Sequence, residues 1–232
     1  MANVEKYKLI NAALPGMFFG IIMSILMVWA YYGHIDIGFL GIHPLHTDGL
    51  PGILTAPFVH SGFDHLYSNL IPFIFLSALL FHFYRSIAWE VFSLIWIITG
   101  TLVWMGAREN WHIGASGVVY GLAVFHVSSG IVRRDNRLMA ISFLTIFLYG
   151  GMLWGIFPEF FPGKRISWES HLAGAITGLI LAIYYRKEGP VKMIYHWDED
   201  EDDPETDTED AYWKDTTSTH PQQGTEIRYH TD

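Results

Sequence analysis

Residues 113–121, IGASGVVYG, place Ser116 at the point where a polar loop becomes an apolar run. Gly117 and Gly121 are four residues apart, so they lie on one face of a helix that begins near the serine. Two glycines with this spacing let helix backbones approach closely within a membrane. We therefore expect this segment to be a helix that packs through its glycines against a partner helix.

The composition of the whole chain is that of a membrane protein. Of its 232 residues, 51% are hydrophobic, 16% are aromatic and only 16% are charged, which is unlike an average soluble domain. A helix of about 20 apolar residues is needed to cross the hydrocarbon layer of a bilayer, and several segments approach that length. The sequence predicts an integral, multi-pass membrane protein.

Six segments are expected to span the membrane as helices, because a helix satisfies its own backbone polar groups in lipid. They are residues 14–32, 65–84, 88–106, 115–132, 138–157 and 168–185. The predicted fold class is an all-α membrane protein with a six-transmembrane-helix bundle. Most lysines and arginines near the spans fall on the side of the two termini, which predicts that both termini are cytoplasmic.

Three regions follow from this topology: an N-terminal segment, residues 1–13, a membrane domain, residues 14–187, and an acidic tail, residues 188–232. The net charge of −9 comes mostly from the tail, and we expect such a run of carboxylates to be solvated and disordered. The loop at 33–64 lacks lysine and arginine and is rich in glycine and proline, which favours an ordered loop at the membrane interface. The expected location is a bacterial plasma membrane.

Polar side chains gather at the external ends of three predicted spans. His65 and Asn69 open the second span, Ser116 and Tyr120 open the fourth, and His171 opens the sixth. Each of the first two pairs is four residues apart and shares one helix face. Strongly polar groups are costly inside a membrane, so their presence at one depth predicts a functional site.

A second glycine pair predicts how two of these residues meet. Gly174 and Gly178 lie on the last span, and His171 precedes Gly174 by three residues, so it shares the face of that pair. If this face packs against the glycines of residues 113–121, Ser116 and His171 come within hydrogen-bond distance.

This geometry suits acyl transfer. A serine hydroxyl becomes a nucleophile when a base takes its proton, and a neutral histidine such as His171 is suited to that role. The developing oxyanion requires donors, and Ser116 at a helix start offers its own backbone N–H. His65 and Asn69 are candidates for further donors.

Other interpretations of the same residues remain open. Gly114 and Gly117 permit the tight turn that would expose Ser116, but a serine between glycines also fits a packing residue of a membrane helix. A lone histidine at a helix end also fits an interfacial residue. A zinc-protease HExxH motif is absent, no two spans each carry an aspartate, and the chain has no cysteine. We therefore expect no metal and no cofactor.

Over about residues 10–187, the chain resembles the rhomboid family of intramembrane serine proteases. Three motifs carry the resemblance: GASG with a tyrosine (Gly114, Ser116, Gly117, Tyr120), HxxxxHxxxN (His60, His65, Asn69) and HxxGxxxG (His171, Gly174, Gly178). The chain departs from the family in two ways. It lacks the Trp-Arg pair that some members carry in the first loop, and it has Ser170 where an alanine is usual.

The resemblance implies a serine endopeptidase that uses a dyad of Ser116 and His171, with Tyr120 packed on the histidine ring. It implies an oxyanion hole of His65, Asn69 and the Ser116 N–H, with His60 supporting the nearby loop. The fifth span with residues 157–168 would gate the entry of substrate.

The expected partners are transmembrane protein substrates and the lipid bilayer. Nucleic acid is not an expected partner, and the sequence does not specify an oligomeric state. Two other functions fit some of the residues: a non-proteolytic rhomboid-like protein that binds membrane helices, and a carrier that uses His65 and His171 as a path for protons or metal ions. Reaction with a serine-directed probe would distinguish the protease from both.

Overall fold

The computed structural model describes residues 2–157, 159 and 167–190, and the fold is that of these residues. They belong to a compact unit that runs from residue 1 to residue 192. The described part of the chain is helical, and it contains one isolated antiparallel bridge, between Ile42 and His112, but no strand. The predicted all-α class is therefore confirmed, whereas most of the predicted acidic tail lies outside the described residues.

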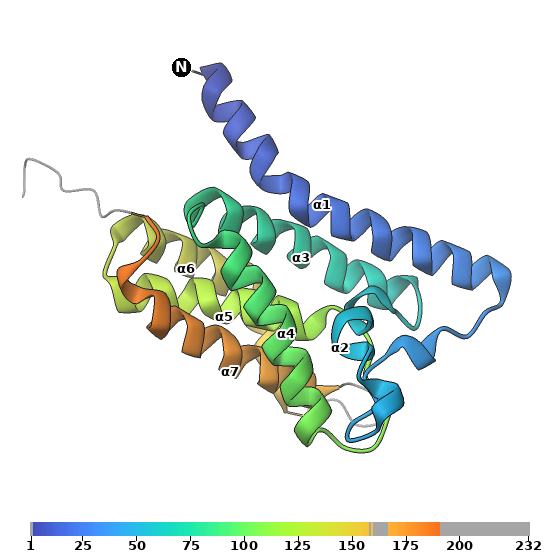
Figure 1. Cartoon of the computed structure of the whole chain (residues 1–232). Coiled ribbons are helices and arrows are strands. Elements are labelled where there is room, and N and C mark those ends of the chain that lie inside the picture. Colours follow the sequence, from blue (N-terminus) through green and yellow to red (C-terminus); the bar gives the residue numbers. More distant parts are fainter. Residues whose placement is uncertain (1, 158, 160–166, 191–232) are drawn as a thin grey trace, which may run out of the picture. The chain divides into compact units, whose positions relative to one another are not determined.

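The described part of the unit contains six helices of 14 residues or more (Figure 1). They are α1 Ala2–Gly33, α3 Phe63–Phe83, α4 Ala88–Gly106, α5 Ser116–Arg133, α6 Asn136–Tyr149 and α7 Trp168–Tyr184. Each coincides with one predicted span. Two boundaries differ by more than two residues: α1 begins twelve residues before the predicted start at residue 14, and α6 ends at Tyr149 instead of residue 157.

The change after Tyr149 follows from two consecutive glycines. Helix α6 ends there, and the chain continues as a 3-10 helix, η4 Gly150–Ile156. Glycine is one of the poorest residues in an α-helix interior, at about 1 kcal/mol relative to alanine, so Gly150 and Gly151 favour the end of α6. This break brings the backbone of η4 beside α7.

Four helical segments are long and apolar enough to cross a membrane: Lys6–Gly33, Phe63–Phe83, Ala88–Gly106 and Asn136–Ile156. Helices α5 and α7 are not among them, and the crossing of the membrane by all six predicted spans stays a prediction. Helix α5 has a physical reason for its lower hydropathy, because α3, α4, α6 and α7 all pack against it. A helix surrounded by protein does not need an apolar face toward lipid.

Glycines set the closest contact in the bundle, between α5 and α7. A Cβ atom at Gly174 would collide with the backbone carbonyl of Gly117, and one at Gly178 would collide with that of Gly121. The predicted packing of the two glycine pairs is therefore present, and no larger side chain fits at Gly174 or Gly178 without separating the helices.

Helix α1 lies along α3 on another side of the bundle (Figure 1). A glycine also lies at the contact of α1 with α3, since a Cβ at Gly16 would lie only 3.1 Å from the Cα of Ile74. The outer face of α6 is strongly apolar and exposed, with Phe143 66% and Phe147 85% accessible. Such exposed apolar surface suits contact with lipid.

The α1–α3 loop, residues 34–62, is ordered, as its composition predicts. It contains η1 Gly38–Leu40, η2 Thr47–Gly49, α2 Gly52–Thr55 and η3 Ala56–Phe58. The bridge of Ile42 with His112 joins it to the α4–α5 loop, residues 107–115, and the Leu45 N–H donates to the Trp104 carbonyl at 2.9 Å. The two loops therefore form one layer at the end of the bundle where α5 begins.

Candidate active site

Ser116 is the first residue of α5, and the loop before it needs a glycine. Gly114 has a φ of +106°, which L side chains rarely adopt. Its N–H donates to the Ala56 carbonyl at 3.0 Å, and a Cβ at this position would lie 2.8 Å from the ring of His65. Gly114 therefore lets the loop turn into α5 while the His65 ring packs directly against it.

His171 lies in the first turn of α7 and is 8% exposed. The close glycine contact between α5 and α7 brings its Nε2 to 3.0 Å from the Oγ of Ser116. The predicted contact between these two residues is thus present in the structure. No aspartate or glutamate side chain is bonded to His171 among the described residues.

The second ring nitrogen of His171 is held by the main chain. Its Nδ1 lies 2.8 Å from the carbonyl oxygen of Gly155 in η4. A carbonyl oxygen can only accept, so the proton must be on Nδ1, and Nε2 is left to accept from the Ser116 hydroxyl. This is the tautomer that a general base for Ser116 requires.

Tyr120 fixes the plane of the same ring. The two rings stack with centroids 4.1 Å apart and an angle of 7° between their planes, and the Tyr120 hydroxyl donates to the Met152 carbonyl. The packing of Tyr120 on His171 that the family resemblance implied is therefore present. Both Met152 and Gly155 belong to η4, so this short helix orients the histidine through two carbonyls.

His65 and Asn69 lie on the first two turns of α3. The Nδ1 of His65 accepts from the Ser61 backbone N–H at 3.4 Å, a long hydrogen bond, and lies 3.2 Å from the Ser61 hydroxyl. This arrangement favours a proton on Nε2, the nitrogen beside Gly114. The Asn69 amide donates to the His65 carbonyl at 2.7 Å. Within the described residues neither side chain bonds Ser116 directly.

His60 packs behind His65 rather than beside Ser116. Its ring is 5% exposed and meets the His65 ring edge to face, with centroids 5.0 Å apart. Burial, with a smaller contribution from the positive charge of protonated His65, lowers the pKa of His60 from 6.5 to about 4, and the Phe58 carbonyl opposes this shift. His60 is therefore a neutral spacer that supports His65.

A polar cluster borders the other side of the Ser116 turn. His112 Nδ1 lies 2.6 Å from the Ser167 hydroxyl, which lies 2.6 Å from the Ser170 hydroxyl. A cavity of about 30 Å³ beside them is also lined by Thr99 and Gly117. The buried Thr99 hydroxyl has no hydrogen-bond partner among the described residues, and a cavity of this size accommodates one or two water molecules.

Sequence reasoning missed three features of this region. The Gly155 carbonyl has no side-chain signature, and the ion pair of Arg108 with Glu169, 3.2 Å between Nε and Oε1, joins positions far apart in the sequence. Metal-ligating side chains also gather in the α1–α3 loop, at His43, His46 and Asp48, where no metal site was predicted. The proposed substrate gate rests largely on residues 158 and 160–166, which lie outside the described residues.

Comparison with known proteins agrees with the geometry. The family model described as Rhomboid domain matches residues 48–188. An uncharacterized protein of Mycobacterium tuberculosis is 35% identical over 149 residues, which cover 61% of this chain and 62% of the relative. An uncharacterized protein of Mycobacterium leprae is 36% identical over 149 residues, which cover 61% of this chain and 59% of the relative.

A more distant viral relative is named as a rhomboid protein. A putative rhomboid protein of Acanthamoeba polyphaga mimivirus is 28% identical over 139 residues, which cover 57% of this chain and 73% of the viral protein. The matched region spans about three fifths of the length of the mycobacterial relatives.

Proposed function

Because the chain belongs to the rhomboid family, we propose that it is an intramembrane serine endopeptidase that cleaves transmembrane segments of other membrane proteins. The observation that carries this proposal is the 3.0 Å contact between His171 Nε2 and Ser116 Oγ. It joins a nucleophile to a base whose tautomer is set by the Gly155 carbonyl. The chain is an integral membrane protein, as its apolar helices and its family indicate.

The first chemical step is acylation of Ser116. His171 Nε2 takes the hydroxyl proton as Oγ attacks the scissile carbonyl carbon, and a tetrahedral oxyanion forms. The imidazolium then gives that proton to the leaving amine, the peptide bond breaks, and an ester with Ser116 remains. While His171 is charged, the Gly155 carbonyl and the face of the Tyr120 ring stabilise it.

The oxyanion requires hydrogen-bond donors at the start of α5. The Ser116 backbone N–H belongs to the first turn of the helix and has no intrahelical partner. The Nε2–H of His65 is one side-chain candidate, since the ring packs on Gly114 two residues before Ser116. Asn69 retains one amide proton beyond the bond to the His65 carbonyl. Removing one oxyanion donor typically costs about 10²–10³-fold in kcat.

Water completes the reaction by attack on the acyl ester, with His171 as base. The cavity beside Gly117 is a source of this water, because its lining includes the unpartnered Thr99 hydroxyl and Ser170. The substrate backbone must leave its helical hydrogen bonds before its carbonyl is accessible. Substrates with small or helix-breaking residues near the depth of Ser116 are therefore favoured.

The proposal includes the topology of the chain. Six spans with both termini in the cytoplasm place Ser116 near the external surface, and the similar mycobacterial proteins support a bacterial plasma membrane. A serine-directed fluorophosphonate probe tests the nucleophile. It should label the wild type at Ser116 and fail to label Ser116→Ala or His171→Ala, whereas labelling of a different serine would contradict the assignment.

A further inference from the structure

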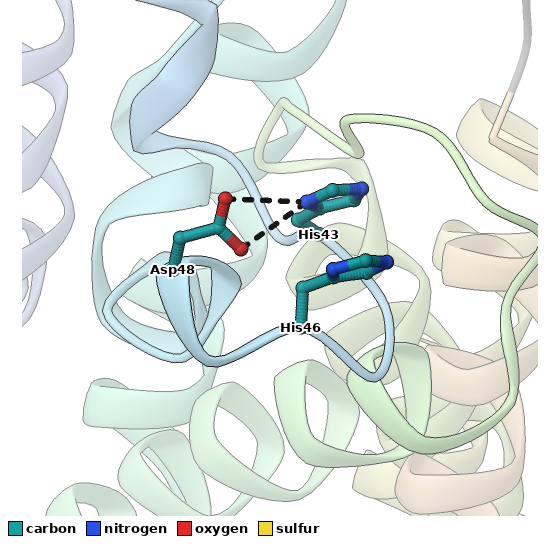
Figure 2. Close-up of side chains that lie close together, drawn as sticks. All are labelled: His43, His46 and Asp48. Carbon is teal, nitrogen blue, oxygen red and sulfur yellow. Dashed lines mark hydrogen bonds and ion pairs between the residues drawn. The ribbon is translucent and has the colours of Figure 1, made fainter.

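Two imidazole rings and a carboxylate converge in the α1–α3 loop, away from the proposed dyad. The ligand atoms of His43, His46 and Asp48 all lie within 4.8 Å of one another. Figure 2 shows the two rings stacked face to face, with Asp48 beside the Nδ1 edge of His43. The distances from that nitrogen to the two carboxylate oxygens are 3.2 and 3.5 Å.

The stacking brings ring nitrogens of the two histidines side by side. The ring centroids are 4.0 Å apart and the planes differ by 3°. A tetrahedral zinc ion with Zn–N bonds of about 2.05 Å needs nitrogens about 3.3 Å apart. Because the lone pair of an imidazole nitrogen lies in the plane of its ring, one of the parallel rings must rotate before both nitrogens can point at one ion, and the half-exposed side chain of His46 permits this rotation.

The backbone that carries these side chains is fixed before any ligand binds. Leu45 turns the chain between the histidines with a φ of +61°, and its N–H donates to the Trp104 carbonyl. The Trp104 indole N–H donates to the His46 carbonyl at 2.9 Å. On the outer face of His43, the Trp111 ring packs with its centroid 4.6 Å away. Helix α4 and the α4–α5 loop thus hold the cluster in place.

We propose that His43, His46 and Asp48 bind a divalent transition-metal ion of the Zn²⁺ class. Imidazole nitrogens with one carboxylate suit zinc, cobalt, nickel and copper, whereas calcium and magnesium prefer oxygen ligands. Three protein ligands on an exposed loop leave a fourth position for water or a further side chain. Glu109 lies nearby, with its Oε1 3.9 Å from the Nε2 of His46, but its carboxylate is not among the converging ligand atoms, so the fourth position is left to water.

All three ligands come from the α1–α3 loop, which the Ile42–His112 bridge joins to the α4–α5 loop that leads to Ser116. The bound ion would stabilise this loop by mass action, because the unfolded chain does not present the three groups together. None of these residues belongs to the proposed dyad, so the metal site does not depend on proteolysis.

Cobalt binding to the full-length protein tests the site. The protein should carry no affinity-tag histidines, and Co²⁺ reports coordination through its visible absorption. We expect one saturable equivalent with an absorption band, displaced by Zn²⁺. His43→Ala, His46→Ala and Asp48→Asn should each weaken binding by at least tenfold, and Glu109→Gln should leave it nearly unchanged.

His34→Asn is the matched control, because His34 is an exposed histidine of the same loop with a φ of +52° that asparagine tolerates. It should bind Co²⁺ as the wild type does. Since the His46 side chain is 51% exposed, its removal leaves the packing of the loop intact, and unchanged circular dichroism will verify this. Equal binding by the wild type and His46→Ala, or no saturable binding by the wild type, would overturn the proposal.

Discussion

His171 Nδ1 lies 2.8 Å from the carbonyl oxygen of Gly155, so the main chain of η4 orients the histidine that faces Ser116. In the Ser-His-Asp arrangement a carboxylate performs this task. A carbonyl dipole selects the same tautomer without a buried negative charge, which would be costly in this buried site. The activity should therefore depend on the position of η4 rather than on any acidic side chain.

Gly155→Ala should lower kcat by at least tenfold. A Cβ at this position would collide with the Tyr120 hydroxyl and lie 3.0 Å from His171 Nδ1, so the ring must shift away from Ser116. Gly151→Ala is the control within η4, because no atom of the described residues lies within 4 Å of its new Cβ. Steady-state kinetics on one substrate compares the two, and equal losses in both variants would contradict the role of Gly155.

Tyr120 contributes through its ring more than through its hydroxyl. Tyr120→Phe keeps the 4.1 Å stack on His171 and loses only a bond to the Met152 carbonyl, worth about 0.5–1.5 kcal/mol. We expect a loss of kcat of less than about tenfold for phenylalanine and a larger loss for Tyr120→Ala. If phenylalanine were as damaging as alanine, the hydroxyl rather than the stack would orient His171.

Gly178→Ala should separate α5 from α7. Its Cβ would collide with the Gly121 carbonyl, and overpacking of this kind costs about 1–3 kcal/mol. We expect a lower thermal midpoint together with lower activity. Gly106→Ala adds the same methyl group at a helix end with open space around it, and it should leave both quantities unchanged. If Gly178→Ala had the same thermal midpoint as the wild type, the close contact between α5 and α7 would be contradicted.

His60 should make the protein less stable in acid. Its pKa is about 4 in the folded state and 6.5 in the unfolded chain, so between these values the unfolded state binds more protons. The contribution of His60 to the free energy of unfolding should fall by about 3 kcal/mol as the pH decreases from about 6.5 to 4.

Thermal midpoints measured across this pH range check the prediction for His60. His60→Asn should give a flatter profile than the wild type, while His34→Asn should keep the wild-type slope. A profile for His60→Asn as steep as that of the wild type would show that another group titrates.

The sequence predicted the parts of the site that side-chain spacing encodes. Ser116, Tyr120 and His171 meet because their helical spacing and the glycine pairs fix the faces of α5 and α7, and α4 has the predicted bounds 88–106. The Gly155 carbonyl was not predictable, because every residue has a carbonyl and its use depends on the break after Tyr149. The His43 and His46 stack depends on the turn at Leu45, which has no periodic pattern.

The most direct test of the proposed dyad is cleavage of a transmembrane substrate by the purified protein in liposomes. The substrate should carry small residues near the depth of Ser116, and wild type should be compared with Ser116→Ala and His171→Ala. We predict that the wild type cuts at one site and that both variants lose at least about 10⁴-fold in rate. Equal cutting by all three proteins, or no cutting by a wild type that also fails to react with a fluorophosphonate, would contradict the account.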